Sequence, residues 1–129
     1  MSKKILLIED DESIAKYIKH RLEKKGLMVL HKDNGIDGLE TIKSEKPDLV
    51  VMDMMMPGID GREVVETVKE KNIIPTDRII ILSGKEVTEE VEALYKLGIQ
   101  DYLRKPINIE HLMIRIDRIL EQLQDKDQS

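Results

Sequence analysis

The chain has 129 residues, of which 40% are hydrophobic and 36% are charged, and its net charge is −5. This length and composition suit one soluble globular domain, and no apolar stretch reaches the roughly 20 residues that a membrane span needs. The absence of cysteine excludes disulfides and thiolate metal sites and fits a reducing cytoplasm, while the acidic balance and the 2% of aromatic residues argue against direct binding of nucleic acid.

Five short apolar runs recur along the chain and predict β-strands. They are "ILLI", "LMVL", "LVVM", "IIIL" and the weaker "DYLRK", at residues 5–8, 27–30, 49–52, 79–82 and 101–105. Runs of this length suit strands, and several of them are rich in Ile and Val. The first, third and fourth runs are continuous instead of alternating, which is typical of parallel strands that are covered on both faces.

Helical patterns lie between and after these runs. Apolar residues recur at helical spacing in five sets: Ile14, Ile18 and Leu22; Ile36, Leu39 and Ile42; Val64, Val65 and Val68; Val87, Val91, Leu94 and Leu97; and Ile109, Leu112, Ile116, Ile119 and Leu123. We expect Gly26 and Gly98 to end the first and fourth helices, and Thr88 and Asn108 to cap the fourth and fifth. The alternation predicts a doubly wound (βα)5 α/β fold with right-handed crossovers.

Polar residues follow each predicted strand. They are Glu9, Asp10, Asp11 and Glu12; Asp33, Asn34 and Gly35; Asp53; Ser83 and Gly84; and Lys105 and Pro106. Ligands of open α/β sheets bind beyond the carboxyl ends of the strands, so these residues should converge. Clustered carboxylates suit Mg²⁺, and Asp53, the lone acid after the central strand, can act as a nucleophile that forms an aspartyl phosphate. Lys105 and Ser83 can contact phosphate oxygens. The sequence therefore predicts a phosphoryl-transfer site.

Four pieces of the chain match one family in order and spacing: "ILLIEDD", "PDLVVMDMMMPGIDG", "IIILSG" and "GIQDYLRKP". Over about residues 3–124, the chain resembles the receiver domain of bacterial two-component response regulators. The resemblance implies a flavodoxin-like fold, with a five-stranded parallel sheet in the order 2-1-3-4-5. It also implies a cytoplasmic signalling domain, not an enzyme, that accepts a phosphoryl group from a sensor histidine kinase or a phosphotransfer protein.

The resemblance assigns a metal site and an acceptor. Glu9 and Asp10 are similar to the acidic pair that holds Mg²⁺, together with Asp53 and the backbone carbonyl of Met55. Asp53 matches the phospho-acceptor, and Lys105 matches the lysine that binds the phosphoryl group. The domain is expected to assist its own phosphotransfer and autodephosphorylation.

The resemblance also assigns residues that report or tune phosphorylation. Ser83 matches the switch hydroxyl and Tyr102 the switch aromatic residue, and the peptide bond before Pro106 is expected to be cis. Met55 and Lys85 occupy positions that tune how fast the phosphoryl group is lost. These roles follow from the family pattern alone.

Two other functions occur on the same fold. An Asp-nucleophile phosphatase would carry a second catalytic Asp two residues after the nucleophile, where this chain has Met55. A flavodoxin-like cofactor carrier would need a phosphate-binding loop rich in Ser, Thr or Gly after the first strand, where this chain is acidic. The acidic run could also cap the first helix, and the scattered His20, His31 and His111 show no ligand spacing.

The output surface is expected on residues 86–124, toward an effector domain or a second copy of the chain. Asp101 and Arg115 suit an ion pair in a dimer that forms through this face. We place the receiver domain at residues 1–124 and interpret residues 125–129 as a frayed end or the start of a linker. The sequence leaves open both a stand-alone protein and a piece of a longer regulator.

Overall fold

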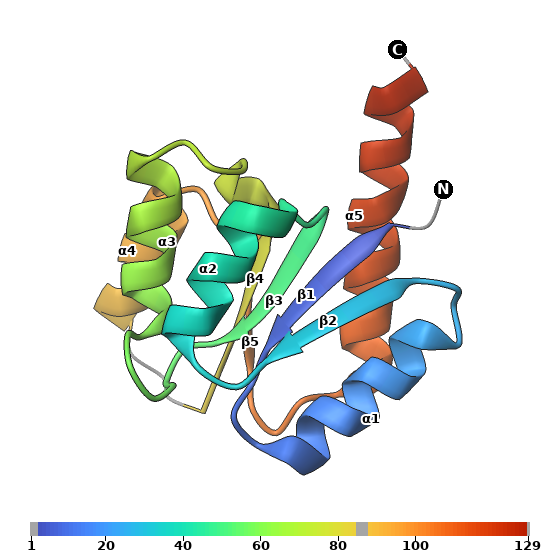
Figure 1. The fold of residues 1–129 in the computed structure, drawn as a ribbon, viewed down its shortest axis with the longest axis horizontal. Coiled ribbons are helices and arrows are strands. Elements are labelled where there is room, and N and C mark those ends of the chain that lie inside the picture. The colour runs from blue at the N-terminus through green and yellow to red at the C-terminus, as the bar shows by residue number, and fades with distance from the viewer. Residues whose placement is uncertain (1–2, 85–87, 129) are drawn as a thin grey trace.

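The computed structural model describes residues 3–84 and 88–128, and strands alternate with helices along them. The elements are β1 (Lys4–Ile8), α1 (Glu12–Glu23), β2 (Met28–Lys32), α2 (Gly35–Glu45), β3 (Leu49–Asp53), α3 (Gly61–Glu70), the 3₁₀ helix η1 (Thr76–Arg78), β4 (Ile79–Ser83), α4 (Thr88–Lys96), β5 (Asp101–Arg104) and α5 (Ile109–Gln128). The strands form one parallel sheet in the order β2-β1-β3-β4-β5 (Figure 1). The predicted fold class and strand order are confirmed.

Helices cover both faces of the sheet, with α1 and α5 on one face and α2, α3 and α4 on the other (Figure 1). Successive side chains of a strand point to opposite faces, so each strand contributes to two cores. In β1, Ile5 and Leu7 pack with α1 and α5, whereas Leu6 and Ile8 pack with α2 and α3. Every residue of β3 and β4 is buried. The continuous apolar runs therefore mark strands that are covered on both faces, as predicted.

Most of the predicted helix ends agree with the structure. Gly26 follows α1 with a φ of 85° and Gly98 follows α4 with a φ of 96°, the left-handed conformation that glycine adopts at little cost. The side chain of Asn108 accepts a hydrogen bond from the backbone N–H of His111 at 3.1 Å, as expected of a cap. The described part of α4 begins at Thr88, and the cap expected at this residue stays a prediction. Val87 lies outside the described residues.

Ile36 was predicted to lie on the buried apolar face of α2, but it is 54% exposed, so this part of the prediction is wrong. The inner face of this helix contains Gly35 and Gly38. A Cβ atom would lie 2.1 Å from the backbone carbonyl oxygen of Ile59 at Gly35, and 2.4 Å from Cδ1 of Ile8 at Gly38, so both close approaches favour glycine. The helix is therefore rotated so that its two glycines, and not Ile36, face inward.

Two boundaries differ from the sequence prediction. β2 begins at Met28 and ends at Lys32, beyond the predicted apolar run, because its pairing with β1 continues through His31 and Lys32. Helix α5 continues to Gln128, beyond the last residue of the predicted apolar pattern, Leu123, and a role of residues 125–129 as a frayed end or linker start stays a prediction. Among the described residues, no helix is both long and apolar enough to cross a membrane.

Candidate functional site

Three carboxylates meet where β1 and β3 end. Glu9 and Asp10 follow β1, and Asp53 is the last residue of β3, which pairs directly with β1. Each of the three offers a carboxylate oxygen, and these oxygens lie within 4.8 Å of one another. Mg²⁺ prefers such oxygen donors, and one or two protein carboxylates are its usual protein ligands. The residues thus fit a site for a hard divalent cation.

Lys105 brings a positive charge to the same cluster from the far side of β4. Its Nζ lies 2.8 Å from Oδ2 of Asp53 and 3.0 Å from Oε1 of Glu9. Its backbone N–H donates to the carbonyl oxygen of Ser83 at 2.7 Å, so the chain beyond β5 is fixed beside β4. Burial acts to lower the pKa of Lys105, but the hydrogen bonds with Asp53 and Glu9 outweigh it and raise this pKa. The ammonium group therefore stays charged.

Glu9 is the most strongly perturbed acid of the cluster. It is fully buried, and burial raises its pKa from 4.5 to about 7. This value includes the hydrogen bond from Lys105, which acts to lower the pKa, and the nearby carboxylate of Asp53, which acts to raise it. With one lysine among three acids, the cluster carries an excess of negative charge at neutral pH that a bound cation would relieve.

The backbone holds Asp53 in place. Asp53 is 6% exposed, and one of its carboxylate oxygens, Oδ1, accepts a hydrogen bond from the N–H of Met55 at 3.3 Å. The N–H of Met54 donates to the carbonyl of Leu82 on β4 at 2.8 Å. A Cβ atom at Gly61 would lie 3.1 Å from Cα of Met54, so glycine allows α3 to begin directly against this turn.

The other residues singled out in the sequence lie on the strands next to the cluster and in the loop after β3. Ser83 ends β4 and is 2% exposed, on the strand next to that of Asp53. Tyr102 is half-buried on β5 and packs against the core on the α2, α3 and α4 side. The side chain of Met55 is 53% exposed. The peptide bond between Lys105 and Pro106 is cis, as predicted, and Lys85 lies outside the described residues.

Two residues contribute to the local structure in ways that the sequence revealed only in part. Asp11 accepts hydrogen bonds from the N–H groups of Ser13 and Ile14, so the acidic run does cap α1 through this residue. His31 places Nε2 at 2.8 Å from the carbonyl oxygen of Glu9, although its sequence position suggested no role. The register of β2 against β1, which pairs His31 with Leu7, is what brings it there.

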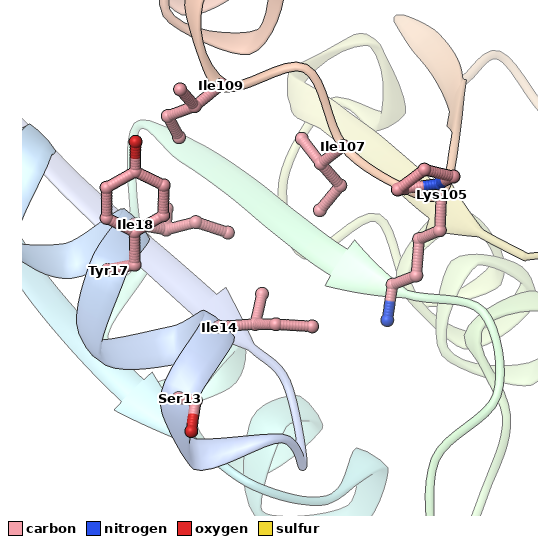
Figure 2. A pocket seen from close by; sticks show the side chains of 8 residues that line it. Ser13, Ile14, Tyr17, Ile18, Lys105, Ile107 and Ile109 are labelled. Carbon is pink, nitrogen blue, oxygen red and sulfur yellow. The ribbon is translucent and has the colours of Figure 1, made fainter.

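An apolar pocket of about 320 Å³ lies beside the cluster, between α1 and the segment that follows β5. Figure 2 shows Ile14 and Ile107 facing each other across it, with Tyr17 and Ile109 toward its other end. Lys105 also lines this pocket, yet its ammonium group contacts Glu9 and Asp53. The carboxylate cluster therefore has an apolar pocket beside it, built from segments far apart in the sequence.

Comparison with known proteins identifies one family. The family model described as the response regulator receiver domain matches residues 5–117. Protein PilH of Pseudomonas aeruginosa is 34% identical over 117 residues, which cover 91% of this chain and 97% of PilH. The response regulator MprA of Mycobacterium tuberculosis is 31% identical over 127 residues, which cover 98% of this chain, and the chain spans about half the length of MprA (54%). A solved receiver domain of the Francisella response regulator 1452 is 33% identical, covers 95% of this chain and 99% of that one, and has a TM-score of 0.86.

Proposed function

This chain belongs to the family of response regulator receiver domains, and we propose that it works as a phosphorylation-dependent switch in which Asp53 carries the phosphoryl group. Receiver domains are signalling domains and not typical enzymes. The observation that carries the proposal is the setting of Asp53, whose carboxylate lies 2.8 Å from Lys105 and within reach of the carboxylates of Glu9 and Asp10.

The phosphoryl donor is a phosphohistidine of a sensor histidine kinase or of a phosphotransfer protein. A carboxylate oxygen of Asp53 forms a bond to phosphorus while the bond between phosphorus and the donor imidazole breaks. The electron pair of that bond goes to the imidazole nitrogen, which takes up a proton. Lys105 holds a phosphoryl oxygen by charge and Ser83 donates a hydrogen bond to another, because this reaction needs mainly positioning and charge neutralisation.

Glu9, Asp10, Asp53 and the backbone carbonyl of Met55 would hold the cation, Mg²⁺. When bound, it neutralises phosphoryl oxygens that the acidic cluster would otherwise repel. The proposal is supported by how the described side chains are held: Glu9 accepts a hydrogen bond from Lys105, and Asp53 accepts one from the N–H of Met55. Asp10 is exposed and so faces the side from which a cation and a donor can approach.

The signal leaves through α4, β5 and α5, within residues 86–124. Asp101 begins β5, and its carboxylate accepts hydrogen bonds from Arg115 of α5 and, at 3.4 Å, from the hydroxyl of Tyr95 of α4. This network joins the three elements beside Tyr102, so a change at Tyr102 can alter the whole face. The face contacts an effector domain or a second copy of the chain, and an intermolecular pair of Asp101 with Arg115 would require their pairing within the chain to open.

The test is phosphorylation of the purified chain by a small acyl phosphate with Mg²⁺, followed by mass spectrometry of the intact protein. We expect one added phosphoryl group in the wild type and none in Asp53→Ala. Asp60→Asn is the matched control, because Asp60 lies in the same loop and caps α3, and Asn can also cap a helix. Equal phosphorylation of Asp53→Ala and the wild type would show that the acceptor is elsewhere.

A further inference from the structure

The carbonyl oxygen of Glu9 is held by the side chain of His31. Nε2 of this histidine lies 2.8 Å from the oxygen, which is hydrogen-bond distance. A carbonyl oxygen only accepts hydrogen bonds, so Nε2 must carry the hydrogen. The contact therefore assigns one tautomer, with the proton on Nε2, to a neutral His31.

Both backbone polar groups of Glu9, its N–H and its carbonyl, are hydrogen-bonded to residues of β2. Its N–H donates to the carbonyl of Lys32 at 3.0 Å, which continues the ladder between β1 and β2. β2 ends at Lys32, and the side chain of His31 reaches the next acceptor, the carbonyl of Glu9. The histidine thus takes the place of a ladder donor just beyond the end of the paired strands.

This contact fixes the orientation of the peptide unit between Glu9 and Asp10. A peptide unit is planar, so holding its oxygen also sets the direction in which the α-carbon of Asp10 leaves it. Glu9 has burial and Lys105 to hold its side chain. Asp10 is exposed, so the direction of its backbone is important for keeping its carboxylate near those of Glu9 and Asp53.

We propose that His31 is a positioning residue of the cation site, which orients the Glu9–Asp10 peptide unit so that the three carboxylates converge. The inference rests on the proposed function, since it takes Glu9, Asp10 and Asp53 as the ligands of Mg²⁺. It adds a residue from the edge strand β2 that is not itself one of the proposed ligands. His31 acts through its N–H and the backbone, not through its charge.

The experiment titrates the full chain with Mg²⁺ alone and follows the amide resonances of Asp10 and Asp11. His31→Leu removes the donor, and we expect it to weaken Mg²⁺ affinity about five- to tenfold, in line with the loss of one hydrogen bond that supports a ligand. His31→Gln keeps an N–H donor of similar reach and should restore affinity to within about twofold of the wild type. His20→Leu, at an exposed histidine of α1, is the matched control and should change nothing.

The outcomes separate this inference from the proposed function. Wild-type affinity in His31→Leu, or equal losses in His31→Leu and His31→Gln, would overturn the positioning role alone. If the wild type itself does not bind Mg²⁺, the proposed cation site fails, and the positioning role fails with it. Should His31→Leu not fold, nitrogen chemical shifts of the wild-type imidazole decide the matter: a proton on Nε2 supports the contact, and a proton on Nδ1 alone refutes it.

Discussion

The buried carboxyl group of Glu9 should make the metal-free protein less stable as the pH rises. Burial raises its pKa from 4.5 to about 7, with the charge of Asp53 adding to the shift and Lys105 opposing it. In the unfolded chain this group ionises near its ordinary pKa. Between pH 4.5 and about 7, the folded protein therefore holds a proton that the unfolded chain has lost, and the contribution of Glu9 to stability falls as the pH rises through this window.

Replacing Glu9 with Gln should recover this loss. The full shift from 4.5 to about 7 sets an upper limit of about 3 kcal/mol, at ~1.4 kcal/mol per pKa unit. Gln keeps a carbonyl oxygen that can accept the hydrogen bond from Lys105. We expect Glu9→Gln to raise the free energy of unfolding of the metal-free protein by about 1–2 kcal/mol at alkaline pH.

Urea unfolding with a chelator present measures this effect. The wild type, Glu9→Gln and Glu121→Gln are compared at pH 8 and at pH 5, and Glu121, an exposed acid of α5, serves as the control. The gain from Glu9→Gln should be clear at pH 8 and should shrink to a small fraction at pH 5, where the folded protein keeps Glu9 protonated. Saturating Mg²⁺ should reverse the ranking at pH 8, because the wild type retains a ligand that the variant lacks. A gain of equal size at both pH values, or a loss at pH 8, would refute the electrostatic reasoning.

Two further predictions concern the lifetime of the phosphoryl group and the surface that changes when it is attached. Met55 is exposed two residues after Asp53, and its side chain has no N–H or O–H group to orient an attacking water molecule. The phosphoryl group should therefore be lost more slowly from the wild type than from Met55→Asn. Equal rates of loss would show that Met55 does not protect the phosphoryl group. A beryllofluoride mimic of the phosphoryl group should change amide exchange in α4 and β5, and sedimentation of the same samples should show whether a second copy binds. Mimic binding without any change of exchange in these elements would contradict the proposed output face.

The buried strands and the site residues at their ends were predictable from the sequence. β1, β3 and β4 are continuous apolar runs, and their ends identify Glu9, Asp53 and Ser83 because parallel strands bring their carboxyl ends to one edge. The prediction failed at Ile36 because a hydrophobic pattern gives no weight to glycine. The close approach of Gly38 to Ile8 is a steric fact that becomes visible only when the helix is placed on the strand.

Contacts that depend on the register between strands could not be predicted from the sequence. Nothing in the spacing of His31 suggests that it meets the carbonyl of Glu9, because this contact requires the pairing of β2 with β1 and the length of β2. The sequence analysis expected Asp101 and Arg115 to form an ion pair across a dimer. The structure pairs them within the chain, which residue charge and spacing did not reveal, and the pair across a dimer stays a prediction.

Hydrogen bonds at the strand ends limit how a phosphoryl group on Asp53 can be sensed. The N–H of Met54 is bound to Leu82 and the N–H of Lys105 to Ser83, so the backbone around the acceptor is fixed on both sides of β4. Phosphorylation replaces one carboxylate with about −1.5 to −2 charges, and water and salt screen this change within about 10 Å. A signal at α4 and α5 must therefore travel by side-chain movement through packed contacts. Tyr102, which is half-buried against the core on the side of α2, α3 and α4 and next in the chain to Asp101, is the residue that we propose converts such a movement into a new surface.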